Sequence, residues 1–488
     1  MKLPIALFWR QRSLFILATL GLLAAVRLWI LPLGNSFWLD ESLVVSIAKN
    51  QIADIGAAAY QAPSQSTLFC YVQWVMLQFA GVNEILTRLP SLLGAAGSAY
   101  VLYRIGAEFV NCEAGLIYAV LFVAFPQTTA EASNARPYAL GLFFHLLALL
   151  TLLRWRRDGR QRTAIVFAVY TALSAYFHLF FLLAVPLEAG YLAWKWPHAR
   201  RRLFEQAAWA GLVLLGCVLP LTPQTSRLMS MRRILEFPSP DDWFELVRFF
   251  FPIGLLAGCF LAWLLAFAPK TFDMKERDHL TLGFLLMVPA LALAGASEFW
   301  HLNLLVPRYL LCSAPGVILV WGSCLRALGP PWVRRMTLAG GLVSSAAFAG
   351  GLAFVPDFQH EDWRSAVRNA HSSDRMLVYN GLAETRQLEW LTDSQHWDYL
   401  MAPVLVYQPG VTQANASLVP FEFTPEDREY MDRILSGFTT EKNVNVIMRV
   451  KFSGLAWLIW LDQHLNRMGF RRTRVSSYGR MELWAYQR

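Results

Sequence analysis

The sequence predicts an all-α polytopic membrane protein that carries a small α/β domain at its carboxyl end. Its 488 residues are 56% hydrophobic and 16% charged, with a mean hydropathy of +0.37, which is too apolar for a soluble protein. Apolar stretches of about 17–25 residues, the length that crosses a bilayer as a helix, recur up to residue 355. From Pro356 onward charged residues become frequent and strand patterns appear. These observations define a membrane domain, 1–355, and a soluble domain, 356–488.

About eleven membrane-spanning helices are expected. The first, 13–33, is too long for the core of a signal peptide, so we expect it to remain as an anchor. Within a long loop of residues 34–87, the moderately apolar stretches 43–59 and 67–80 are predicted to lie at the membrane surface. The remaining spans are expected near 88–106, 113–129, 138–153, 163–177, 179–194, 205–223, 246–268, 280–298, 309–327 and 336–355.

The net charge of +9 follows a pattern that indicates topology. Basic residues cluster between apolar stretches, at residues 2–12, 154–162, 195–202, 270–277 and 334–335. Such loops favour the cytoplasm, so this charge predicts orientation and not a nucleic-acid partner. With the clusters inside, the amino terminus is cytoplasmic, whereas the loop 34–87 and the soluble domain lie outside. The six cysteines show neither disulfide nor zinc spacing.

The soluble domain has recognisable elements. "DRMLVY", "NVIMRV" and "RMELWAYQ" are typical of strands. "TPEDREYMDRILSGF" predicts a helix with Thr424 as its cap, Pro425 at its first position and Gly437 near its end. "LAWLIWLDQHLNRMGF" predicts a second helix.

The predicted topology gathers polar residues on the outer face. "FWLDES" places Asp40 and Glu41 just after the first span, where we expect both carboxylates to stand in water. A carboxylate can take a proton from a hydroxyl, and the planar fork of arginine matches phosphate oxygens. The other outer candidates are Glu131, Asn134, Arg136, Tyr138, His178, Arg232, Arg233, His301, Arg308 and Tyr309. This combination suits a reaction on a phosphate-bearing lipid.

Five segments in order, "FWLDES", "LTRLPSLLGAAGSAYVLYRIG", "NARPYAL", "FHLFF" and "VPRYLLCSAPGVIL", resemble the polyprenyl-phosphate-dependent glycosyltransferases of the GT-C fold. Bacterial relatives of protein O-mannosyltransferases and of the lipid A aminoarabinose transferase are the most similar, and "EDWRSAVRNA" is common among them. The resemblance covers residues 10–380. It implies a bacterial inner-membrane enzyme that transfers a sugar from a polyprenyl-phosphate donor to an acceptor hydroxyl.

The resemblance also implies roles for particular residues. Asp40 matches the family's catalytic base, with Glu41 beside it. Arg136 with Tyr138, and Arg308 with Tyr309, are expected to bind the donor phosphate and stabilise its charge as it leaves. The further partners are membrane lipids and an acceptor (lipid, glycan or protein) that the residues do not identify. No Walker or dinucleotide glycine motif indicates a nucleotide donor.

Two departures from the family pattern concern a second acid or metal. Asn134 stands where the family usually has a carboxylate, and "APSQSTLF" replaces a stretch with two prolines. Because hard divalent cations prefer charged oxygen ligands, we assign no metal ligand and expect activity without added divalent ions. Magnesium or manganese stays an alternative, with Glu131 as the compensating carboxylate and Asp40 and Glu131 as the ligands.

Each candidate also has a structural alternative. Asp40 could cap a helix that begins at Glu41 or Ser42. Arg136 and Arg308 could be interfacial residues with snorkelling side chains, and His178 could serve packing alone. Arginines 227–233 could meet anionic lipid headgroups. At the level of function, the alternative is a transporter or flippase for lipid-linked sugars, or a membrane scaffold that displays a soluble domain.

Overall fold

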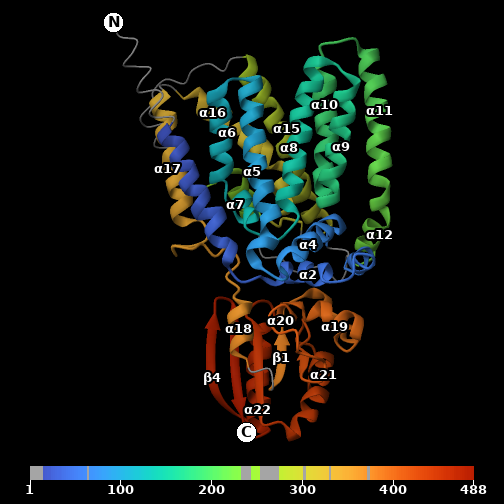
Figure 1. Cartoon of the computed structure of the whole chain (residues 1–488), viewed down its shortest axis with the longest axis vertical. Coiled ribbons are helices and arrows are strands. Elements are labelled where there is room, and N and C mark those ends of the chain that lie inside the picture. Colours follow the sequence, from blue (N-terminus) through green and yellow to red (C-terminus); the bar gives the residue numbers. More distant parts are fainter. Residues whose placement is uncertain are drawn as a thin grey trace. The chain divides into compact units, whose positions relative to one another are not determined.

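The computed structural model describes residues 15–62, 65–231, 243–252, 274–300, 304–328, 331–370 and 374–488. Their contacts divide the chain into two compact units (Figure 1). The first unit takes in the described residues of 1–33, 88–226 and 237–358, and the second those of 34–87, 227–236 and 359–488. One division therefore falls close to the predicted boundary at residue 356. The loop 34–87, which the sequence analysis placed with the membrane domain, groups with the carboxyl-terminal residues.

The first unit is a bundle of helices that run side by side (Figure 1). An apolar amino-terminal helix, Phe15–Gly34, is followed by α5 (Glu84–Phe109), α6 (Cys112–Ala124), α7 (Pro126–Ala132), α8 (Tyr138–Asp158), α9 (Gln161–Phe177), the 3₁₀ helix η3 (Leu179–Ala184), α10 (Val185–Lys195), α11 (Arg200–Val218), α12 (Thr222–Ser230), α13 (Trp243–Phe250), α15 (Met274–Trp300), η5 (Tyr309–Ser313), α16 (Ala314–Ala327) and α17 (Pro331–Phe348).

Among the described residues, six helices are long and apolar enough to cross a membrane, and a seventh if the bent pair α6–α7 is one span. The six are Phe15–Gly34, Glu84–Phe109, Tyr138–Asp158, Arg200–Ser230, Met274–Trp300 and Tyr309–Ala327. The predicted spans at 163–177, 179–194 and 336–355 correspond to α9, α10 and α17. These three helices are too short or not apolar enough to be counted among the six. The predicted span 246–268 lies mostly outside the described residues.

Small residues bring neighbouring helices of the bundle into close contact. A Cβ atom on Gly106 of α5 would lie 2.4 Å from the backbone nitrogen of Gly115 in α6. A Cβ atom on Gly316 of α16 would lie 2.6 Å from the carbonyl oxygen of Gly283 in α15. Both distances are shorter than van der Waals contact, so a larger residue would push the helices apart. Such close approach is how helices gain packing energy in a lipid environment.

The two ends of α8 differ in their chemistry. Tyr138 begins the helix, and Arg154, Arg156 and Arg157 lie in its last turns. Two of these arginines pair with Glu108 of α5, at 2.7 Å each. A helix of 21 residues is about 30 Å long, the thickness of the hydrocarbon core. The predicted inner basic cluster and Tyr138 are therefore one membrane thickness apart along the same helix.

The second unit is built around a five-stranded mixed sheet of order β2-β1-β3-β5-β4. Its strands are β1 (Arg375–Tyr379), β2 (Ala416–Leu418), β3 (Asn443–Arg449), β4 (Arg471–Tyr478) and β5 (Met481–Gln487). β1 pairs in parallel with β2 and with β3, whereas β5 is antiparallel to β3 and β4. All three predicted strands are present in this sheet. Both predicted helices are present as α21 (Pro425–Ser436), capped by Thr424, and α22 (Gly454–Arg467).

The remaining helices of this unit come from both ends of the chain. They are α2 (Leu39–Ala48), α3 (Ile55–Gln61), α4 (Thr67–Ala80), α18 (Trp363–Asn369), η6 (Ala383–Arg386), η7 (Leu388–Leu391), α19 (Ser394–Leu400), α20 (Ala402–Leu405) and η8 (Gly437–Thr440). Trp38, Leu39 and Leu43 are buried in the same hydrophobic cluster as Met376 of β1 and Val446 of β3. The start of α2 is thus part of the core that holds the sheet.

Candidate active site

The "FWLDES" segment forms the start of α2 in the second unit. The helix begins at Leu39, with Trp38 in extended conformation as the residue that precedes it. The Trp38 N–H donates a hydrogen bond to Glu41 Oε2 at 3.2 Å, so Glu41 satisfies one of the free N–H groups at this helix end. Glu41 is fully buried, at 0% exposure, whereas Asp40 is partly exposed.

Two expectations about this pair are therefore corrected. Only Asp40 reaches solvent, because the helix start folds the Glu41 carboxylate back onto the backbone. Asp40 is also not the N-cap residue, since it is the second residue inside the helix. The reason is that Trp38 is already extended and Leu39 packs into the core, which sets the first turn one to two residues earlier than the acidic pair suggested.

The segment "EDWRSAVRNA" holds this helix start in place within the second unit. Glu361 accepts a hydrogen bond from the Leu39 N–H at 3.3 Å and another from Trp363 Nε1 at 3.2 Å. Its other oxygen pairs with Arg449, the last residue of β3, at 2.6 Å. A single buried carboxylate thus joins the sheet to the residue that precedes Asp40.

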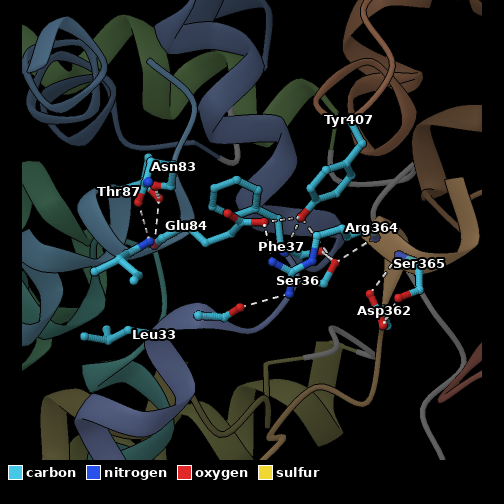
Figure 2. A network of polar contacts seen from close by, with 12 residues as sticks. Leu33, Ser36, Phe37, Asn83, Glu84, Thr87, Asp362, Arg364, Ser365 and Tyr407 are labelled. Carbon is cyan, nitrogen blue, oxygen red and sulfur yellow. Dashed lines mark hydrogen bonds and ion pairs between the residues drawn. The ribbon is translucent and has the colours of Figure 1, made fainter. Parts of the chain in front are cut away.

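A second group of polar contacts fixes the residues before α2 (Figure 2). Tyr407 accepts a hydrogen bond from the Phe37 N–H at 2.7 Å and donates one to Glu84 at 3.2 Å. Arg364 also contacts Glu84, at 3.3 Å, and its backbone N–H donates to Ser36 Oγ at 3.0 Å. These contacts join the residues before α2, and Glu84 near the end of the loop 34–87, to Arg364 of the "EDWR" segment and to Tyr407. Asp40 is therefore carried by a well-supported backbone.

Glu384, which the sequence analysis did not single out, is a buried carboxyl whose pKa responds to the charge of Asp40. It lies in η6, directly after β1, and is 8% exposed. Burial and the negative charge of Asp40 raise the pKa of the Glu384 carboxyl to about 7. Its position after the predicted strand "DRMLVY" could have revealed it, because ligands of open α/β sheets bind beyond the carboxyl ends of parallel strands.

In the first unit, the structure brings the predicted donor-site residues together. Arg136 Nη2 donates to the Tyr138 hydroxyl at 3.3 Å. The His178 ring lies 5.1 Å from the Tyr138 ring and stacks on the Tyr309 ring at 5.4 Å, measured between centroids. The guanidinium of Arg308 lies 5.5 Å from the centre of the Tyr309 ring. Two guanidinium groups and three rings from separate segments form one cluster, which we call the arginine–tyrosine cluster.

The local sequence explains why Arg136 faces inward at this point. Pro137 cannot continue a helix in the amino-terminal direction, and α8 begins at Tyr138 directly after it. The Arg136 carbonyl accepts a hydrogen bond from Ser91 Oγ of α5 at 2.9 Å, which fixes the turn. Arg136 is only 3% exposed. At this depth a guanidinium attracts a nearby negative charge such as a phosphate more strongly than it would in water.

The carboxylate and amide before this turn contact each other. Asn134 Nδ2 donates to Glu131 Oε2 at 3.1 Å, and both side chains are buried. Within the described residues, no group of three or more His, Cys, Asp or Glu side chains is arranged to hold a metal ion. His301, Arg232 and Arg233 lie outside the described residues.

The fold defines the class of protein. The chain is a multi-pass membrane protein of the GT-C fold with a carboxyl-terminal mixed sheet. The family "Dolichyl-phosphate-mannose-protein mannosyltransferase" matches residues 64–223, which supports the resemblance drawn from the motifs. Among curated proteins, none matches the sequence.

Solved structures cover nearly the whole chain. ArnT from Cupriavidus metallidurans in the apo state is 12% identical, with a TM-score of 0.56 over 96% of this chain and 97% of that one. The same protein bound to undecaprenyl phosphate is 11% identical, with a TM-score of 0.55 over the same shares. An Archaeoglobus fulgidus oligosaccharyltransferase is 13% identical, with a TM-score of 0.42 over 97% of this chain and 73% of that one.

Proposed function

We propose that this chain is a glycosyltransferase of the bacterial inner membrane that transfers one sugar from a polyprenyl-phosphate donor to an acceptor hydroxyl on the outer face. The observation that carries the proposal is the arginine–tyrosine cluster at the start of α8, one membrane thickness from the inner basic cluster. The likeness of the whole fold to a protein that binds undecaprenyl phosphate supports the choice of donor.

The cluster suits the headgroup of such a donor. Arg136 and Arg308 present planar donors that match phosphate oxygens, and Tyr138 and Tyr309 lie against them. When the bond between the sugar and the phosphate breaks, a diester becomes a monoester and gains negative charge. The guanidinium groups stabilise that charge, and their burial makes the attraction stronger than in water.

Asp40 is the general base of the proposed reaction. It takes the proton of the acceptor hydroxyl while the acceptor oxygen bonds to the anomeric carbon with inversion. The bond between that carbon and the phosphate oxygen breaks, and its electron pair leaves with the phosphate. Asp40 fits the role because it is partly exposed and held on a supported backbone. We assign Glu41 to the helix end, since its carboxylate accepts the Trp38 N–H.

One observation favours the alternative, a transporter or flippase for a lipid-linked sugar. His145 of α8 and Glu188 of α10 are buried in the helix bundle, with Nδ1 and Oε1 4.0 Å apart. Ionisable residues inside membrane helices are frequent in transporters. The enzyme stays our first choice, because the larger group of polar candidates gathers at the start of α8 and not along the helix.

The deciding experiment compares membranes of cells with and without the gene product by mass spectrometry of glycolipids and glycoproteins. The enzyme proposal expects a sugar-bearing product that requires the wild-type chain and is lost with Asp40→Asn. The transporter alternative expects a donor lipid that changes its side of the membrane without a new covalent product, and sensitivity to Glu188→Gln. A product that forms equally well with Asp40→Asn would contradict the assignment of the base.

A further inference from the structure

The amino-terminal helix, drawn in blue in Figure 1, and α17 beside it enclose an apolar groove of about 300 Å³. Apolar side chains from both helices line the groove, among them Leu20, Leu23, Ala24, Leu342, Val343 and Ala347. Its floor is buried at Ala24 and Leu342, whereas its rims are exposed at Leu23 and Val343. Because the amino-terminal helix is long and apolar enough to span a membrane, these open rims face lipid and not water.

Arg27 is the charged side chain among the described residues that line the groove. About 10 Å of helix separate it from Gly34, the predicted outer end of this span. From such a depth the long side chain of arginine reaches the headgroup region, while its apolar stem stays in the hydrocarbon. The groove therefore has an apolar body and a cationic mouth.

The guanidinium of Arg27 is held in place by the chain that follows α17. Nη1 donates to the carbonyl oxygen of Ala349 at 3.3 Å, and Nη2 donates to those of Gly351 at 3.1 Å and Ala353 at 2.8 Å. The chain turns at Gly350 and Gly351, whose φ values of +71° and +90° favour glycine. A cation suits the carbonyl end of a helix, so this contact also closes the end of α17.

This guanidinium has donors and charge left over. Three of its five N–H groups point at carbonyl oxygens, so the Nε–H and one Nη1–H remain for another acceptor. The three acceptors are neutral, and within the described residues no carboxylate pairs with Arg27. By contrast, Arg104, a partly exposed arginine of α5, contacts Glu108 at 3.5 Å. The positive charge of Arg27 is one that an external anion can neutralise.

The helix geometry changes at the same place. Leu20, Ala24 and Arg27 recur at helical spacing, so they share the face that meets α17. The turn that contains Arg27, η1 (Val26–Ile30), is a π-helix within the apolar amino-terminal helix. Single π-helical turns are rare and occur frequently at functional sites. The π turn is thus a sign of function at the cationic mouth that does not depend on the shape of the groove.

We propose that this groove binds one anionic phospholipid of the surrounding bilayer, with the lipid phosphate on Arg27 and part of one acyl chain between the amino-terminal helix and α17. The site is separate from the arginine–tyrosine cluster, and it does not depend on the proposed reaction. Hydrocarbon contact alone gives no preference for one lipid, because the groove and the lipid tails are equally apolar.

The preference comes from charge and from size. An anionic lipid neutralises Arg27, whereas the amine of a zwitterionic lipid offsets the charge of its own phosphate. A volume of about 300 Å³ lies at the low end for ligand pockets. It suits part of one acyl chain better than a long polyprenyl tail, so a phospholipid is the expected occupant.

Native mass spectrometry of the full-length protein, titrated in detergent with one lipid at a time, measures the affinity for the first bound lipid. We expect the wild type to bind phosphatidylglycerol about fivefold more tightly than phosphatidylcholine, the preference that one arginine near a membrane surface supplies. Arg27→Gln should abolish the preference, and Arg27→Lys should keep part of it. Arg104→Gln is the matched control and should keep all of it, because that arginine already has a carboxylate partner.

A second variant leaves the charge intact. Ala347 is exposed and lines the groove, so Ala347→Phe places a ring in the groove and should reduce the preference with little change in the unfolding midpoint. It is the deciding variant if Arg27→Gln does not fold. Equal affinity of the wild type for both phospholipids, or a preference that survives either substitution, would overturn the site. Undecaprenyl phosphate that binds more tightly than phosphatidylglycerol, and loses this advantage in Arg27→Gln, would reject a phospholipid as the occupant.

Discussion

Arg449 and Glu361 form a buried ion pair, with 2.6 Å between Arg449 Nη2 and Glu361 Oε1. The same carboxylate accepts hydrogen bonds from the Leu39 N–H and the Trp363 indole. One side chain thereby links the end of β3, the start of α18 and the start of α2. A substitution of either residue of this pair therefore affects the position of the backbone that carries Asp40.

Breaking this pair from one side should destabilise the second unit. Glu361→Gln leaves the Arg449 guanidinium buried without a countercharge, which typically costs about 3–5 kcal/mol. We expect a clearly lower midpoint of thermal unfolding for the full-length protein in detergent. The control is Glu422→Gln, because the pair Arg386–Glu422 is more exposed, at 20% and 47%, and such pairs contribute about 0–1 kcal/mol. Similar small effects at both sites would contradict the prediction.

Asp40 and Glu41 should respond differently to substitution. Asp40→Asn cannot accept the acceptor proton, so turnover should fall about 10²–10⁴-fold while the unfolding midpoint stays near that of the wild type. Glu41→Ala leaves the Trp38 N–H buried without its acceptor and should cost roughly 1–3 kcal/mol of stability. Glu41→Gln keeps an oxygen in place and should be milder. Transfer rates and melting curves of the three variants, measured side by side, separate the two roles.

Donor binding should depend on the fork of Arg308. Arg308→Lys keeps the positive charge but loses the paired N–H donors, so affinity for undecaprenyl phosphate should fall while the protein stays folded. Arg308→Ala should lower it further. Arg248→Ala is the control, because that exposed arginine pairs with Glu245 within its own helix. Microscale thermophoresis measures the affinity of each variant for undecaprenyl phosphate. If all three variants bind it equally well, Arg308 serves only as an interfacial anchor.

The Glu384 carboxyl should make stability depend on pH. Its pKa is about 7 in the folded protein, and about 4.3 is expected when unfolded. The neutral form is favoured in the folded state, so this contribution is fully present below pH 4.3 and is lost as the pH rises to 7. The difference is roughly 3–4 kcal/mol. Between pH 5 and 7, the wild type should therefore lose more stability than Glu384→Gln. If the unfolding midpoints of the two proteins change equally with pH, the pKa of Glu384 is not raised.

The structure adds a constraint to the predicted membrane topology. Residues 34–87 and 359–488 share one compact unit and one hydrophobic cluster, so they lie on the same side of the membrane. The chain between them must then cross an even number of times. A periplasmic reporter fused after Arg488 should be active, and a cysteine introduced at exposed Gln51 should react with a membrane-impermeant reagent. A cytoplasmic reading of either probe would reverse the proposed orientation.

Most of the fold could be predicted from sequence patterns. Apolar length predicted the membrane helices, and the Thr424-Pro425 start predicted α21, because both signals are local. The order of the motifs implied the arginine–tyrosine cluster. β4 was missed because it is an exposed edge strand whose residues do not alternate. The packing of the α2 start against Glu361 and the raised pKa of Glu384 depend on residues more than 300 positions apart in the chain, which no local pattern reports.

The shared core of α2 and the carboxyl-terminal sheet has a consequence for how the protein is made. Trp38, Leu39 and Leu43 leave the ribosome early, yet their packing partners in β1 and β3 follow more than 300 residues later. At about 5–20 residues per second, that is a delay of roughly 15–60 s. During this delay the apolar residues of the first loop have no packing partners, so nascent chains stalled before residue 359 should bind chaperones through this loop. The start of α2, with Asp40, cannot take its final form until synthesis is complete.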